Sequence, residues 1–300
     1  MIFLETGHPI IEETIRTRLD PETKPEPLDI TCSDFDDVKY HIVATSSNKN
    51  VLSFRMAMPC YSSLASMGAT AALDSKYGRY QSREKVDGYD LVFEIDVNES
   101  SADRDAVAKD FGEIKRNIMA APFRRCFEAL AAGKSSSIKP MVIPFRPNER
   151  IVLAPGNDRV MVFFTFHFAD VTDRALAKVF LQEMSEAGRK VPQAPAVTFT
   201  TEIPGDLAKV REFKPADNLV GYVMFQVFKS HVEGAEKMEK IITLFQGFRA
   251  YLHYHIKASK SHLHSRMRNR VELLLKVLKR ADPTAGDEST SKKAYRTYNN

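Results

Sequence analysis

The feature that most constrains the fold is a segment without proline near the end of the chain, from Gly234 to Ala281. The spacing of Ser230 and Glu233 matches a helix capping box, and the next proline is Pro283. A helix over 234–281 would be roughly 70 Å long at about 1.5 Å per residue. Typical helices have only about 10 to 14 residues. One domain of a chain this size cannot cover such a helix along its whole length.

The segment carries one apolar stripe whose members recur every three or four residues, interrupted once by Ser259. The mean step exceeds the roughly 3.5 residues of a strict heptad, so straight packing on another helix is favoured over a long left-handed coiled coil. Tyr251, Tyr254 and Leu273 widen the apolar surface. In order, the stripe consists of Ile241, Phe245, Phe248, Leu252, Ile256, Leu263, Met267, Val271, Leu274 and Leu278.

The first half of this helix can pack on the preceding domain, but the second half has little left in the chain to cover it. Each buried apolar side chain there would contribute about 1.5–3 kcal/mol, whereas an exposed apolar stripe favours aggregation. We therefore expect a partner protein on the second half. The alternative is a helix that folds back on its own domain. The residues expected at the partner surface are Ile256, Leu263, Met267, Val271, Leu274 and Leu278.

Charge separates this helix from the body of the chain. Between Phe245 and Ala281, nine Lys or Arg residues stand against one acid, Glu272, whereas the residues before Phe245 are mildly acidic in sum. A basic rod on an acidic body predicts an acidic partner for the rod. Gly247 lies inside the helix, where glycine costs about 0.5–1 kcal/mol relative to alanine, so we expect close packing there.

The residues before the helix predict one plan used twice, with strands identified by alternation and by β-branched or aromatic residues. The first copy has expected strands at 28–35, 38–43, 50–58 and 88–97, and expected helices at 61–77 and 101–132. Pro122 is expected to kink or divide the second of these helices. The second copy has a helix at 172–190, with Thr172 as N-cap and Gly188 near its end, and strands at 137–145, 150–154, 158–168, 196–203 and 217–228.

Many consecutive strands are joined by only a few residues, which favours antiparallel pairing. The predicted fold class is therefore α+β: two similar α/β domains with largely antiparallel sheets, followed by one long C-terminal helix. The short polar run GKSSS marks the linker between the domains, and the residues after the helix are polar and expected to be disordered. The expected divisions are 1–133, 138–233, the helix 234–281 and the tail 282–300.

Histidines on the predicted helix do not form a metal site. Facing pairs, His255 with His262 and His253 with His264, are separated by rises of about 10 and 16 Å. Ligands that share one zinc ion usually sit about three to five residues apart. Histidines used as polar contacts are the better interpretation, and no metal is predicted.

Other chemistry is also not indicated. The fragment AAGKSSS resembles a phosphate-binding loop, but Glu128 occupies the required glycine position and a helix precedes it. Arg124 and Arg125 could lower the pKa of the Cys126 thiol, although a helical Cys beside Phe127 is more typical of packing. No metalloprotease, nucleophile-elbow or dinucleotide motif is present. We predict no catalytic residue, no cofactor and no enzyme.

The remaining composition bears on location and on the class of partner. Cys32, Cys60 and Cys126 fit neither a disulfide framework nor a zinc ligand pair, which predicts a reducing, cytoplasmic compartment. No window reaches the roughly 18–20 apolar residues of a membrane span, and the first residues do not form a signal peptide. A basic helix that binds nucleic acid is the alternative function. It is not favoured, because some cations border the apolar face.

Several segments together resemble one known family. FRAYLHYHIKASKSHLHSRMR followed by LKVLKRADP is similar to the long C-terminal helix of subunit 2 of the actin-related protein 2/3 complex. The resemblance extends over nearly the whole chain through DFDDVKYHI, GEIKRN, DRVMVFFTFHF, AKVFLQEM and DNLVGYVMF, in the family's order.

The resemblance implies a structural role without catalysis. It implies that the chain forms, with subunit 4, the core that holds the two actin-related proteins and that docks on the side of an existing actin filament, from which a branch grows. The apolar positions of the helix would then pack on subunit 4. Cations would serve subunit 4 or the acidic filament surface: Arg189, Lys190, Arg266, Arg268, Arg270, Lys276 and Lys279.

Overall fold

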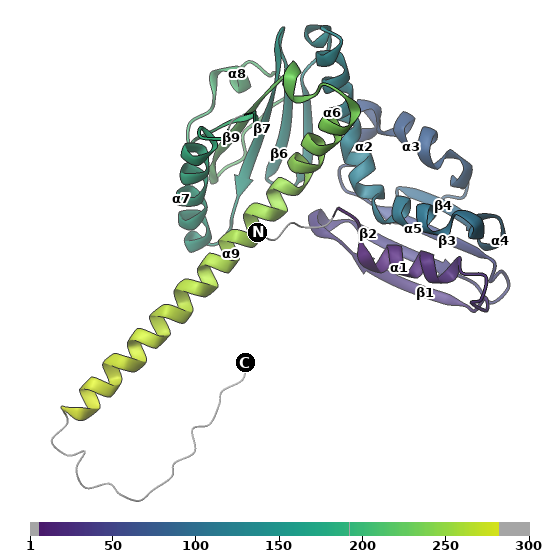
Figure 1. The fold of residues 1–300 in the computed structure, drawn as a ribbon, viewed down its shortest axis with the longest axis horizontal. Helices are drawn as coiled ribbons and strands as arrows, with labels where there is room; N and C mark the ends of the chain where they lie inside the picture. The colour runs from purple at the N-terminus through teal and green to yellow at the C-terminus, as the bar shows by residue number, and fades with distance from the viewer. Residues whose placement is uncertain (1–5, 192, 282–300) are drawn as a thin grey trace, which may run out of the picture.

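A computed structural model describes residues 6–191 and 193–281 of the chain. It contains two antiparallel β-sheets with their helices, followed by one long helix, α9 (Ala235–Arg280, 46 residues). Figure 1 shows α9 crossing one face of the second sheet and then running away from the body as a rod. The predicted α+β class is confirmed, and every strand pair in the described residues is antiparallel. The boundaries between domains stay a prediction, and the tail 282–300 lies outside the described residues.

The first sheet has four strands in sequence order: β1 (Leu28–Ser33), β2 (Lys39–Ala44), β3 (Val51–Ala57) and β4 (Leu91–Asp96). Burial alternates along β3, because successive side chains of a strand point to opposite faces. Phe54 and Phe93 therefore meet Phe111 on the inner face, with ring centroids 5.1 and 5.7 Å from that of Phe111.

Short helices pack beside the buried face of this sheet. They are α1 (Pro9–Arg18), α2 (Tyr61–Leu64), α3 (Thr70–Tyr77), α4 (Val97–Ser100) and α5 (Arg104–Gly112), and a five-residue π-helical turn at Ala65–Ala69 joins α2 to α3. We predicted no element at α1. It packs closely against α5 and buries Ile11 and Ile15 completely.

The second sheet has five strands in the order β5-β6-β7-β9-β8, namely β5 (Met141–Arg146), β6 (Glu149–Pro155), β7 (Arg159–His167), β9 (Leu219–Phe228) and β8 (Ala196–Thr200). The central strand β7 is buried on both faces. Phe164 and Phe166 face α9, whereas Phe163 belongs to a small second core with Leu207 of α8 (Gly205–Ala208). Helix α7 (Val171–Gly188) packs beside α9.

Helix α6 (Ile114–Ala131) joins the two halves of the chain. Phe123 stacks on Phe245 of α9 with centroids 5.9 Å apart, and Phe127 lies 6.2 Å from the same ring. Phe245 also contacts Phe225 of the second sheet at 5.1 Å. Buried side chains of both sheets consequently form one continuous hydrophobic core.

Three local predictions differ from the structure. The helix expected at 101–132 is divided at Glu113, between α5 and α6, and Pro122 lies inside α6 without ending it. Asp170, not Thr172, caps α7, because its Oδ1 accepts a hydrogen bond from the Asp173 N–H at 2.9 Å. Helix α9 begins after Gly234, which has a φ of 88°, without a side-chain cap from Ser230.

Candidate protein-interaction site on the C-terminal helix

The first half of α9 is anchored by aromatic packing. Phe248 meets Phe225 and Phe164 edge to face, with centroids 5.1 and 5.2 Å apart. Such pairs contribute about 0.5–1.5 kcal/mol beyond the burial of apolar area. Leu252 and Ile256 continue the same buried stripe toward the second half of the helix.

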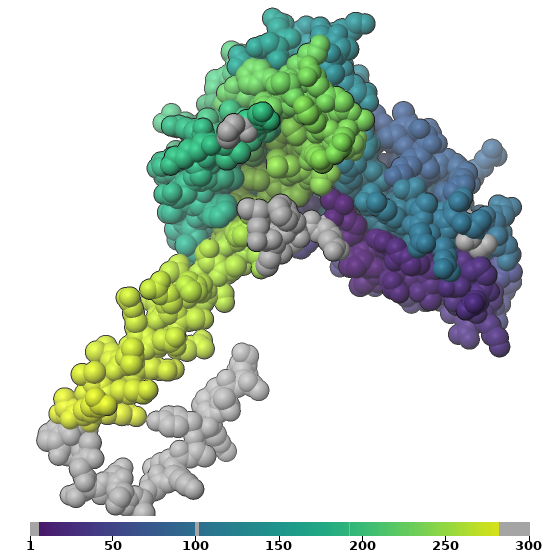
Figure 2. Space-filling view, viewed as in Figure 1, coloured from purple at the N-terminus to yellow at the C-terminus, as the bar shows by residue number. Residues whose placement is uncertain are grey.

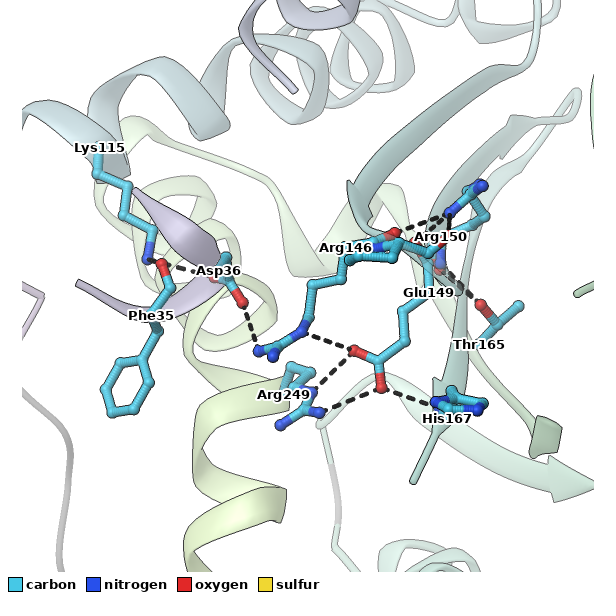
Figure 3. Close-up of polar contacts among 10 residues, drawn as sticks. Phe35, Asp36, Lys115, Arg146, Glu149, Arg150, Thr165, His167 and Arg249 are labelled. Atoms are coloured by element: carbon cyan, nitrogen blue, oxygen red, sulfur yellow. Dashed lines mark hydrogen bonds and ion pairs between the residues drawn. The ribbon is translucent and has the colours of Figure 1, made fainter. Parts of the chain in front are cut away.

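A buried ion pair fixes the helix to the start of strand β6 in the second sheet (Figure 3). Arg249 donates from Nε to Glu149 Oε2 at 2.9 Å and from Nη2 to Oε1 at 3.2 Å. The same carboxylate accepts the His167 N–H at 2.9 Å, so both of its oxygens are satisfied. Arg146 lies 3.5 Å from Glu149 and reaches Asp36 of the first half at 3.0 Å. This network therefore links α9 to the second sheet and to the turn between β1 and β2 of the first.

Two further ion-pair clusters hold the helix along its length. Near its start, Glu239 accepts from Arg124 Nε at 2.6 Å and Nη2 at 2.9 Å, and Arg116 Nη2 lies 2.6 Å from its Oε2. Hydrogen bonds from these arginines outweigh the burial that opposes ionisation of Glu239, so its pKa lies below the ordinary value. Because both arginines belong to α6, this cluster fixes the start of α9 on the helix that joins the two halves.

The last anchor lies at the N-terminus of α7. Lys260 Nζ donates to Asp173 Oδ1 at 2.9 Å and to Asp170 Oδ1 at 3.0 Å, and Lys257 also donates to Asp173. The Asp173 N–H and then Lys260 lower the pKa of Asp170 to about 2. Burial opposes ionisation of Asp173, but hydrogen bonds from Lys257 and Lys260 outweigh it and lower its pKa.

Beyond Lys260 the helix has no further tertiary support among the described residues. Every residue from 261 to 280 is exposed, and Figure 2 shows this part, in yellow, projecting from the body. We call these residues the free half of α9. Leu263 is 43% exposed and Met267 is 64% exposed, although a helix on its own domain would bury both. The alternative of a helix folded back on its body is therefore not observed in the part of the chain that the structure describes.

The structure brings together most, but not all, of the residues predicted at the site. Leu263, Met267, Val271, Leu274 and Leu278 lie on one exposed side of the free half. Ile256 is 1% exposed, so the prediction that it meets a partner is wrong: it packs in this chain's own core.

The predicted cations fall into two separate groups. Arg266, Arg268, Arg270, Lys276 and Lys279 are exposed on the free half, and none forms an ion pair with another described residue. Arg189 and Lys190 follow the C-terminal end of α7, whereas its N-terminal end meets Lys260. They therefore lie roughly 24 Å along α7 from the anchor and form no single patch with the rod.

Comparison with known proteins identifies the family. The model of the family described as Arp2/3 complex, 34 kD subunit p34-Arc, matches residues 54–285, which include the whole of α9. The chain belongs to the p34-Arc family. Actin-related protein 2/3 complex subunit 2 of Dictyostelium discoideum is 33% identical over 94% of both chains. The protein of the same name from Schizosaccharomyces pombe is 34% identical, over 94% of this chain and 95% of its own.

His255 and Cys126 of this p34-Arc family member act as packing residues. His255 lies between Tyr251, with centroids 4.2 Å apart, and Phe180 at 5.8 Å. Burial raises the pKa of the Cys126 thiol to about 12, so the neighbouring arginines do not activate it. The described residues contain no group of three or more His, Cys, Asp or Glu placed to hold a metal ion, and no helix among them is long and apolar enough to cross a membrane.

The sequence interpretation missed part of the apolar surface of the free half. Leu275 and Val277 are 50% and 60% exposed, yet the single-stripe pattern leaves both out. The signal was the run VELLLKVL at 271–278, in which apolar residues outnumber the positions that one stripe can hold. Because the prediction assigned apolar positions to a single helical period, it left out the additional apolar residues of this run.

Proposed function

We propose that this chain is a non-catalytic structural subunit of the Arp2/3 complex in the cytoplasmic actin cytoskeleton. The observation that carries the proposal is the free half of α9, an exposed amphipathic helix within a family of Arp2/3 complex subunits. Two relatives that match over nearly their whole length bear the name of subunit 2 of that complex. A structural subunit of a complex that nucleates branched actin filaments needs surfaces that bind the neighbouring subunits, and it needs no active site.

The neighbour proposed for the apolar side of the free half is subunit 4. Burial of Leu263, Met267, Val271, Leu274 and Leu278 against it would contribute about 1.5–3 kcal/mol for each side chain, before the cost of association. The anchors at Glu149, Asp170 and Asp173 hold the helix in one direction. A pre-directed helix loses less conformational freedom on binding, which favours a stable pair.

The proposed role of the free cations is contact with acidic surfaces. Lys276 points away from the apolar side, and Arg268 lies at its border. Neither carries an ion pair with described residues, so both suit the acidic side of the mother actin filament. Arg189 and Lys190 would form a second, separate contact. A nucleic-acid role gains no support from this arrangement, because leucines and valines occupy the side that a basic nucleic-acid helix would leave polar.

The proposal is tested by affinity purification of the tagged full-length chain from its native cell. We expect a stoichiometric set of proteins that includes two actin-related proteins and subunit 4, unchanged by nuclease treatment. A matched variant, Leu263→Ser with Leu274→Ser, should lose the set while its isolated fold is kept, since both side chains are exposed. Recovery of nuclease-sensitive partners, or of the same set with the variant, would contradict the proposal.

A further inference from the structure

The apolar surface of the free half changes width along the helix. Between 261 and 270, only Leu263 and Met267 are apolar, and they lie one turn apart on one side. Arg266 and Arg270 border this stripe on one flank, and Arg268 borders it on the other, at about 100° per residue. This part has the form of a narrow seam with cations on both edges, which one partner helix with acidic edges would cover.

The last two turns are different. Six of the eight residues from 271 to 278 are apolar, and each of the six is between 50% and 60% exposed. Leu273, Leu274 and Leu275 are consecutive, so their side chains span an arc of roughly 200°. The other three members fall inside this arc, and only Glu272 and Lys276 lie outside it. We call the residues 271–278 the tip of α9.

An arc of this width does not suit a single neighbouring helix. A helix that packs on one neighbour presents an apolar stripe of about 100°. With one neighbour, either Leu273 or Leu275 would remain in water beside several other apolar side chains, a patch typical of an incomplete interface. Contact from two sides removes both from water.

We propose that the partner that covers the seam encloses the tip of α9 in an apolar groove built from at least two of its elements. The groove would have an acidic rim, since Lys279 and Arg280 lie just outside the two edges of the arc, whereas Lys276 lies opposite its centre. The occupant is thus one protein subunit whose surface changes from a single element beside 261–270 to a groove around 271–278. This inference rests on the proposed function and deepens it.

Photo-crosslinking tests the groove directly. A benzoylphenylalanine placed at Leu273 or at Leu275 in the full-length chain, bound to coexpressed subunit 4, should crosslink to subunit 4 from both positions. Mass spectrometry should assign the two crosslinks to segments of subunit 4 that are well separated in its sequence. Placed at Lys276, the same group should give little crosslink. A crosslink from only one of the two leucines, or both crosslinks to one segment, would overturn the inference.

Substitutions separate failure of the groove from failure of the proposed function. Leu273→Ser and Leu275→Ser should each weaken binding of subunit 4 at least tenfold, because each removes a buried apolar side chain. Lys276→Ser is the control for the change in helix propensity, and its affinity for subunit 4 should stay within about threefold of the wild type. Leu274 lies at the centre of the arc, where even a single neighbouring element would cover it, so Leu274→Ser tests the pairing with subunit 4 itself. If Leu274→Ser has no effect, the proposed pairing itself fails. If Leu274→Ser weakens binding while Leu273→Ser or Leu275→Ser does not, only the groove is wrong.

Discussion

Arg249 shows how a single buried side chain helps to fix the direction of α9. It is 9% exposed, pairs with Glu149, which is 2% exposed, and lies over the Phe168 ring at 5.3 Å. Sequence pattern alone placed Arg249 among the cations of a basic helix and assigned Glu149 no role. The pair joins residues one hundred positions apart, and no local periodicity indicates such a partner.

Removal of one member of this pair should be costly. Glu149→Leu leaves Arg249 buried without its counter-charge, and loss of one partner of a buried ion pair costs about 3–5 kcal/mol. We expect a decrease of that size in the free energy of unfolding, measured with urea. The double variant Glu149→Leu with Arg249→Met should lose clearly less than the single variant. Strictly additive effects in this double-mutant cycle would contradict the role given to the pair.

Gly247 shows a residue whose predicted reason is wrong. Close packing was expected, but a Cβ added there would meet nothing within 4 Å. Gly247→Ala should therefore raise the free energy of unfolding by about 0.5–1 kcal/mol, because alanine has the higher helix propensity. Gly221→Ala is the matched opposite, since its Cβ would lie 2.5 Å from the Thr200 carbonyl oxygen. A gain from both substitutions, measured by urea unfolding, would contradict this account of the two glycines.

The anchor at α7 predicts a response to pH. The pKa of Asp170 is about 2 in the folded chain, below the ordinary value near 3.8. A depressed folded pKa means that the stabilisation is complete above the ordinary value and is lost as pH falls toward 2. Carboxyl NMR titration should show Asp170 ionising near pH 2, and Lys260→Gln should raise this value in part, because the Asp173 N–H bond remains. An unchanged midpoint in Lys260→Gln would exclude the contribution of Lys260.

At the scale of elements, the strands and the long helix could be predicted, whereas the short N-terminal helix could not. Every strand that the structure describes overlaps a predicted one, since alternation and turn residues are local signals. The N-terminal helix α1 was missed although Pro9 stands at its first position and Ile11 and Ile15 are four apart. A short helix of this kind depends on tertiary packing, here against α5, more than on its own propensity.

Helix α9 consists of two parts with different requirements. Its first part needs the second sheet, α6 and α7, because aromatic contacts and ion pairs from all three converge on it. Its free half is covered by no described residue of this chain, and we propose that another chain covers it. The division falls at Lys260, and the apolar period continues across it, interrupted only by Ser259. Periodicity therefore predicted the helix and the exposed stripe, but not that Ile256 belongs to the body.

At the scale of the whole molecule, the chain consists of a folded body and a projecting arm, the free half of α9 (Figure 2). The core is continuous between the two sheets through α6 and Phe245, which gives the arm a firm base. A partner was predicted because the long helix has more apolar surface than the body of the chain can cover. The full width of the tip was not predicted, because Leu275 and Val277 depart from the regular stripe on which the prediction rested.

The basic arm predicts salt-dependent docking. Arg268→Glu with Lys276→Glu should weaken cosedimentation of the assembled complex with actin filaments, most strongly at low salt, because exposed charges are screened within about 8 Å at physiological ionic strength. Lys237→Glu, at the anchored end of α9, is the control and should have little effect. Cosedimentation that stays at the wild-type level at every salt concentration would contradict a role for these two cations at the filament.

The most direct test of the central claim is hydrogen exchange of the free half, followed by mass spectrometry in the isolated chain and in its pair with subunit 4. A helix without tertiary support opens readily, so amides from 261 to 280 should exchange rapidly in the isolated chain while the anchored half stays protected. In the pair, both halves should be protected to a similar degree. Strong protection of 261–280 in the isolated monomer, or its absence in the pair, would contradict the claim that this helix is completed by another subunit.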